Sequence, residues 1–221
     1  DLVLRLLITM ALALLVFLLR HRTTLTHSAL LGAVLFGYAS WTLANWVWVL
    51  PPLTLFLLHL LVWPRSHPNT NRHNIHAVIS TAAPGLLWLF LYAHHAEPLL
   101  LFPFTTLFAA HLAIIAVSWF SPTNWSLPTI LRLGRAVLAG CTLSLLPLIA
   151  LFLASPYAPA AVLSLRDHLP VFLGINLLAV TLAVILFAAL LPHLLDPRAN
   201  RYLHIHQAGG LCAFIGSAAT L

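Results

Sequence analysis

Long apolar runs separated by short polar stretches follow one another along the whole 221-residue chain. Each run holds close to the ~20 residues that an α-helix needs to cross the hydrocarbon core of a bilayer. The pattern predicts an all-α, polytopic integral membrane helix bundle with about eight transmembrane helices. The predicted helices cover residues 2–19, 27–44, 46–63, 75–93, 98–119, 136–155, 169–193 and 205–221.

Residues 27–63 are the ambiguous part of this pattern, because their single apolar run exceeds one span of about 20 residues. Asn45 and the Pro51-Pro52 pair offer places to turn, and a broken segment is the alternative to two spans. The arginines favour two spans, since splitting the run puts eight of ten arginines in alternate connections. Arginine-rich loops stay on the inner side of a membrane, so we expect residues 1 and 221 on the outer side. These eight are Arg20, Arg22, Arg65, Arg72, Arg132, Arg135, Arg198 and Arg201.

The composition excludes a soluble domain, since 62% of residues are hydrophobic and 6% are charged, against about a quarter charged in soluble domains. The net charge of +6 comes from arginine alone, with no lysine. These arginines are dispersed between apolar segments, which argues against nucleic-acid binding.

We expect one transmembrane domain over 1–221 with both ends trimmed, in a bacterial inner membrane or an organelle membrane. The predicted partners are the lipid bilayer and other membrane subunits.

Small residues recur four apart in three of the predicted helices, a spacing that lets helix backbones approach closely. The tryptophans near residues 41–48, at a predicted outer hairpin, are typical of an aromatic belt. For Trp88 we expect packing between helices instead. The small-residue stripes are Ala29, Ala33 and Gly37; Ala136, Gly140 and Ser144; and Gly209, Ala213 and Ser217.

Thirteen histidines carry most of the candidate chemistry, because histidine can ligate metal or heme and titrates near neutral pH. His59 and His111 fall well within apolar sequence, where a polar ring needs a partner. Imidazole is an axial ligand of heme iron and a common copper ligand. We therefore expect a heme b or copper site in the inner half of the bundle, with His59 and His111 as first candidates. The alternative is that both rings hydrogen-bond across helices.

Three further histidines could approach the same site from the inner boundary, namely His76, His204 and His206. His204 and His206 are two residues apart, so on a helix their side chains point about 200° away from each other. We expect at most one of them to serve the site.

A second candidate site, for a metal or for proton entry, lies on two outer connections, which carry nitrogen and carboxylate ligands. An exposed ion pair is the alternative, and such a pair contributes little. The residues are His94, His95, Glu97, Asp167 and His168.

Two stretches resemble the NnrS family, membrane proteins associated with heme, copper and the response to nitric oxide. The first runs from Leu53 through His59 and Trp63-Pro64-Arg65 to Arg72-His73-Asn74. The second is Leu203-His204 with Gly209 five residues on. The resemblance implies a heme- or copper-associated protein, with His204 as the residue that best matches the late-helix motif.

The sequence therefore predicts a membrane protein that binds heme or a transition metal through bundle histidines, for electron transfer or small-molecule handling. One alternative is a non-catalytic structural subunit of a larger membrane complex. A second is a small-molecule transporter. No catalytic residue is identified, and whether the protein is an enzyme stays open.

Overall fold

The computed structural model describes residues 2–19, 26–66, 75–120, 128–153, 165, 168–190 and 201–221. The regular structure in these ranges is helical, which confirms the predicted all-α class. The elements are α1 (Leu2–Leu19), α2 (His27–Leu43), η1 (Trp46–Val49), α3 (Leu50–Ser66), α4 (Ile75–His95), η2 (Pro98–Leu100), α5 (Leu101–Phe120), α6 (Pro128–Leu153), α8 (Leu169–Leu190) and α9 (Arg201–Ala218).

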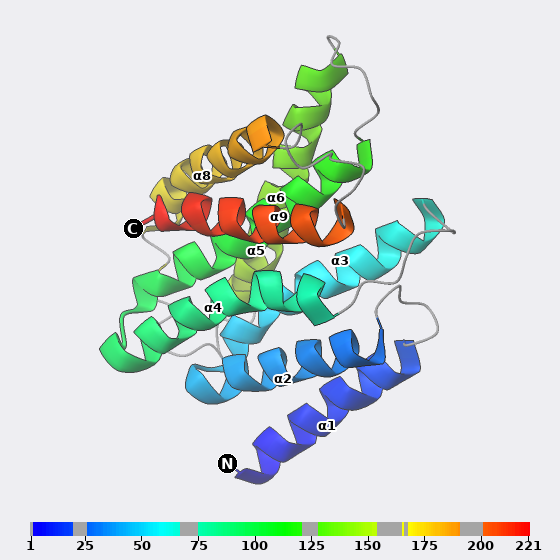
Figure 1. Cartoon of the computed structure of the whole chain (residues 1–221). Helices are drawn as coiled ribbons and strands as arrows, with labels where there is room; N and C mark the ends of the chain where they lie inside the picture. The colour runs from blue at the N-terminus through cyan, green and yellow to red at the C-terminus, as the bar shows by residue number, and fades with distance from the viewer. Residues whose placement is uncertain are drawn as a thin grey trace.

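The helices form a bundle in which successive helices from α1 to α5 run in alternating directions, and α8 and α9 also run opposite to each other (Figure 1). Both ends of the chain lie on the left-hand side of this view. In the described part of the chain, three segments are long and apolar enough to cross a membrane. They are Ile75–His95, Pro98–Val117 and Leu169–Leu190.

The ambiguous run of residues 27–63 is broken into two helices, as predicted. Helix α2 ends at Leu43, and the Asn45 side chain then accepts a hydrogen bond of 3.0 Å from the Val47 amide and so caps η1. Pro51 and Pro52 do not make the turn. They lie in the first turn of α3, where a missing N–H leaves no helical bond unmade.

Two helices begin earlier than the apolar pattern predicts. Helix α6 starts at Pro128 rather than near 136, and α9 starts at Arg201 rather than near 205. The apolar run marks where a helix is hydrophobic, whereas the helix itself continues into polar residues as long as nothing breaks it. Pro128 is well suited to the first helical position, because its fixed φ angle is already helical.

Helix α5 is the centre of the bundle. It contacts α3, α4, α6, α8 and α9, and every side chain from Leu101 to Val117 is buried. A helix that is hydrophobic on all sides belongs inside a larger assembly of helices. The polar side chains that α5 carries must therefore be satisfied by its neighbours.

One buried hydrogen-bond chain joins α5 to α6 and α8. Thr106 donates to the Asn176 side-chain oxygen at 2.9 Å, and the Asn176 amide donates to the Ser144 hydroxyl at 3.0 Å. Ser144 also bonds the Gly140 carbonyl of its own helix at 3.2 Å. The chain gives the amide oxygen and nitrogen of Asn176 one partner each, on two different helices.

Glycines bring three pairs of helices into backbone contact. A Cβ atom at Gly140 would lie 2.5 Å from the Ala109 carbonyl oxygen, and one at Gly216 would lie 2.7 Å from that of Ala179. A Cβ at Gly210 would meet the Ser80 carbonyl. Such close approach permits weak Cα–H···O contacts between helices. Pro84, which has no N–H, cannot make the usual helical bond to that same Ser80 carbonyl.

Two of the three predicted small-residue stripes are fully buried, and the stripe of α6 contains Gly140. Ala136, Gly140 and Ser144 are all buried on α6, and the stripe of α9 is buried as well. The stripes therefore serve packing within this chain.

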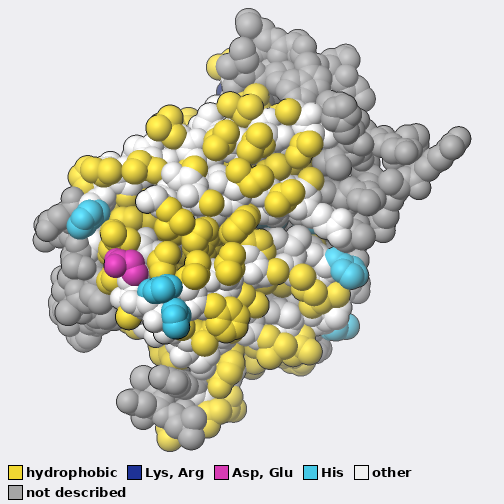
Figure 2. All heavy atoms as spheres, turned by 60° about the vertical axis from the view of Figure 1, so that its left-hand side comes forward, with side chains coloured by type: hydrophobic (Ala, Val, Ile, Leu, Met, Phe, Trp, Pro, Cys, Tyr) yellow, Lys and Arg dark blue, Asp and Glu magenta, His cyan; other side chains and the backbone are white. Residues whose placement is uncertain are grey.

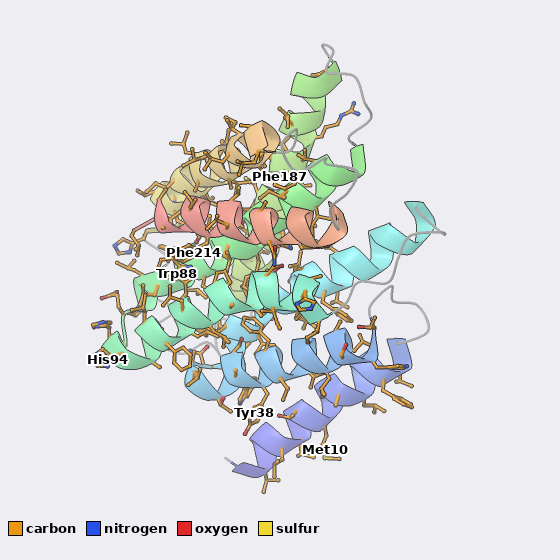
Figure 3. All side chains as sticks on the ribbon, viewed as in Figure 1. Met10, Tyr38, Trp88, His94, Phe187 and Phe214 are labelled. Atoms are coloured by element: carbon orange, nitrogen blue, oxygen red, sulfur yellow. The ribbon has the colours of Figure 1, made fainter. Side chains whose placement is uncertain are left out.

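Trp88 packs between helices, as predicted. Its indole N–H donates to the Ser217 hydroxyl of α9 at 3.1 Å, and its ring lies 5.7 Å from that of Phe214 (Figure 3). Trp48 differs from the predicted aromatic belt, because it is buried against Tyr92 and Phe104 at ring distances of 4.6 and 4.8 Å. The chain folds back at η1, which turns this ring inward.

The Asn176 hydrogen bonds should contribute to stability. We expect Asn176→Leu to lower the free energy of unfolding by about 1–2 kcal/mol, because it removes two interhelical bonds in a buried site. The measurement is chemical denaturation in mixed micelles. The matched control is Thr181→Val on the same helix, whose hydroxyl bonds the Leu177 carbonyl of its own turn and which should change stability by less than about 0.5 kcal/mol. Equal effects of the two variants would contradict the role given to Asn176.

Helices α4 and α9 lie so close together at Gly210 that any side chain there should push them apart. We expect Gly210→Ala to destabilise the protein by about 1–3 kcal/mol, because its Cβ would displace a backbone carbonyl rather than a flexible side chain. Gly174→Ala is the control, since a Cβ there meets no described atom within 4 Å. That variant should be neutral or slightly stabilising. Thermal unfolding of both variants in the same detergent checks this.

Candidate functional site

His111 lies near the middle of the buried helix α5 and is 3% exposed. Its Nε2 atom is 2.9 Å from the hydroxyl of Thr81 on α4, a hydrogen bond in which the ring tautomer decides the donor. The prediction that this ring needs a partner is confirmed. The His111 ring is held at two points, by its covalent bond to Cβ and by the hydrogen bond between Nε2 and Thr81. This leaves the ring little freedom to rotate.

His206 on α9 lies beside His111. The two ring centres are 6.3 Å apart with 28° between the ring planes, and His206 is 8% exposed. They meet because α4, α5 and α9 all contact one another. Gly209 helps, since a Cβ there would lie 3.2 Å from Ile114 of α5. Two imidazoles from distant parts of the sequence thus share one buried site.

The two rings line a pocket of about 150 Å³. Three of its lining residues are polar, namely Thr81, His111 and His206, and the rest are apolar. The apolar lining is Ala33, Val34, Phe36, Gly37, Val49, Pro52, Leu53, Leu55, Phe56, Ala77, Val78, Ala82, Phe108 and Ile115. The pocket therefore joins an apolar space to a polar end built from α4, α5 and α9.

The spacing of the two imidazoles is compatible with a shared metal ion. A zinc or copper ion lies ~2.0–2.1 Å from each ligating nitrogen, which places the centres of two ligating rings about 5–6.5 Å apart. The observed 6.3 Å lies at the upper end of that range, which corresponds to a nearly linear arrangement of the two nitrogens about the ion, whereas a tetrahedral zinc ion would place the ring centres about 5 Å apart. Imidazole suits copper, zinc, iron and nickel, so the pair provides two ligands for such an ion.

A heme fits this space less well than an ion. Pockets that enclose ligands of drug size measure ~300–1,000 Å³, and this pocket measures about 150 Å³. A porphyrin held by both rings would also have to separate α5 from α9, two helices in close contact.

The other predicted inner histidines take different positions. His76 is exposed near the start of α4, so its side chain does not line the pocket. His59 lies in α3, one turn beyond Leu55 and Phe56, and His204 lies in the first turn of α9. The side chains of His59 and His204 are outside the described residues. Of the five predicted inner ligands, the structure brings His111 and His206 together.

The predicted outer site lies at the end of α4. His94 and His95 are exposed and their ring centres are 4.7 Å apart, while Glu97 caps η2 by accepting from the Leu99 amide at 3.2 Å. Figure 2 shows histidines beside a carboxylate on a largely hydrophobic face. His168 is exposed, and Asp167 lies outside the described residues. Over the described ranges, no three His, Cys, Asp or Glu residues gather closely enough to hold a metal ion.

Thr81 is the site residue that sequence reasoning missed. It stands in an apolar helix three residues before Pro84, and many such threonines bond their own helix. Its role follows from which helix faces which, and residues 81, 111 and 206 are too far apart in sequence for periodicity to connect them. The one available signal was that a buried His111 requires a partner.

No protein-family model, curated protein or solved structure matches this chain. The resemblance to the NnrS family therefore stays a prediction.

Proposed function

We propose that this chain is a multi-pass membrane protein that binds a transition metal ion through His111 and His206. The single observation that carries the proposal is the meeting of these two buried imidazoles at a ring-centre distance of 6.3 Å. Thr81 bonds the Nε2 atom of His111, as an outer-shell partner orients a histidine that ligates a metal through its other ring nitrogen. The ion would support electron transfer or the handling of a small molecule in the adjoining pocket.

Eight membrane crossings are the second part of the proposal. The helices alternate in direction from α1 to α5 (Figure 1), as consecutive spans joined by short loops do. Arg65 lies in the last turn of α3 and Arg201 is the first residue of α9, and both helix ends lie on the right-hand side of Figure 1. That shared side is what the positive-inside rule requires.

A packing role in a larger complex receives less support from the structure. Small-residue stripes are one feature that fits such a role, and those on α6 and α9 are buried within this chain. They are therefore not available to a partner subunit.

The crossing pattern can be tested by cysteine labelling. In a background carrying Cys141→Ala and Cys212→Ala, we expect Ala96→Cys and Asn71→Cys to react with a membrane-impermeant maleimide from opposite sides of sealed vesicles. The reason is that one full helix, α4, separates the two positions. Labelling of both cysteines from the same side would contradict the crossing of α4. Labelling after detergent lysis confirms that each cysteine is reactive.

Metal binding can be tested on purified, metal-depleted protein. We expect one copper or zinc ion per chain, and an affinity at least about 100-fold lower in His111→Ala and in His206→Ala, because each removes one of two ligands. Loss of outer-shell partners alone costs ~10–100-fold, so Thr81→Val should show the smaller effect. Titration of copper(I), copper(II) and zinc(II) against chromogenic chelators gives the affinities.

His168→Ala is the matched control, since it removes an exposed histidine of the predicted outer site. It should leave the stoichiometry and affinity unchanged. Unaltered metal binding in both His111→Ala and His206→Ala would overturn the proposal. A Soret band in the purified protein, lost in either variant, would show heme in place of a free ion.

A further inference from the structure

The pocket beside His111 and His206 is deep at one end and open at the other. The lining residues of α5 and α9 are buried, as are Ala77 and Thr81 of α4, whereas Val78 and Ala82 of α4 are half-buried. Most of those on α2 and α3 are only half-buried, including Ala33 and Leu53. The open side of the pocket therefore lies along α2 and α3.

Helices α2 and α3 leave this opening because they diverge. They are joined through η1 at one end, and from there α2 packs on α1 and α4 while α3 packs on α5 and α6. Figure 1 shows the two helices separating away from η1. In a membrane-spanning bundle, an opening between two helices faces the hydrocarbon region rather than water. A ligand that enters here must be uncharged and soluble in lipid.

The volume sets the size of such a ligand. A cavity of about 150 Å³ lined by Leu, Ile and Phe in another protein stays dry and binds benzene or xenon. This pocket has a similar volume and a similar apolar lining. The space inside it therefore has room for one six-membered ring, and any larger ligand would have to extend out through the open side.

The polar end sets the chemistry of the ligand. The Thr81 hydroxyl and the imidazoles of His111 and His206 face the same pocket, and all three groups can exchange hydrogen-bond roles. A hydroxyl or carbonyl oxygen on the ring could join this network, whereas a purely hydrocarbon ring could not. The remaining lining is apolar and offers a second polar substituent nothing to bond.

We propose that the pocket binds a single-ring, uncharged, membrane-soluble molecule that carries one hydroxyl or carbonyl oxygen, with the ring against α2 and α3 and the oxygen at Thr81, His111 and His206. The inference rests on the proposed function only for the membrane placement of the helices. It does not require the metal ion.

Two fluorinated probes of nearly equal size test the proposal, 4-fluorophenol and fluorobenzene. Metal-free protein in lipid nanodiscs is titrated with each, and saturable binding is followed by fluorine NMR, since partition into lipid does not saturate. We expect 4-fluorophenol to bind and to be displaced by phenol. We expect fluorobenzene to bind about fivefold more weakly, the ratio that one net hydrogen bond provides.

Two neighbouring alanines of α4 provide the matched pair of variants. Ala82→Leu fills the pocket and should weaken 4-fluorophenol binding by at least about tenfold, whereas Ala83→Leu adds the same atoms on an exposed face and should not. If Ala82→Leu does not fold, Ala33→Leu fills the same pocket from α2. Thr81→Val keeps the shape and should reduce the preference for the phenol over fluorobenzene.

The outcomes separate this inference from the metal site. Saturable probe binding that Ala82→Leu removes, in protein that holds no metal, supports the inference even if no metal ever binds. Metal binding through His111 and His206 without saturable probe binding overturns the inference and leaves the proposed function standing. Probe binding that is equal in the Ala82→Leu and Ala83→Leu variants also overturns it.

Discussion

A polar side chain on α5 can be satisfied only by another helix or by its own backbone. Every side chain from Leu101 to Val117 is buried, and in such surroundings an unsatisfied polar group costs several kcal/mol. This constraint selects the neighbours of α5. Thr106 requires Asn176 of α8, and His111 requires Thr81 of α4. These two pairs require α8 and α4 to lie beside α5.

Close backbone approach is the second requirement, because short side chains such as serine and threonine reach only a near neighbour. Gly140 and Gly216 lie against backbone carbonyls of the adjacent helices, and Gly209 lies against Ile114. Without them α6 and α9 would stand farther from α5 and α8. In lipid, where there is little hydrophobic driving force between helices, packing and polar contacts of this kind hold helix bundles together.

The sequence predicted the helices, apart from the early starts of α6 and α9, but it did not predict which residues meet at the site, and the reason is physical. Hydrophobic runs reveal where helices lie because each span must be apolar along its length, and the break at Asn45 was visible as a capping residue within such a run. The need of His111 for a partner was equally visible. Its partners were not, since contacts between helices depend on rotation about each axis and on order in the bundle. His206 looked like a boundary residue by position, and only the contacts of α9 with α4 and α5 make it a buried one.

The two polar clusters on α5 meet the same constraint in different ways, and that difference separates packing from function. At Thr106, the amide oxygen and nitrogen of Asn176 each have a partner, and none of the three side chains lines the pocket. At His111, the partners are a hydroxyl and a second imidazole, both of which can change hydrogen-bond role, and all three line a space of about 150 Å³. If His111 only stabilised the bundle, hydrogen bonds of the Thr106–Asn176 kind, away from any pocket, would be enough. Groups that can exchange protons or ligate an ion, held next to room for a small molecule, are instead what a binding site requires.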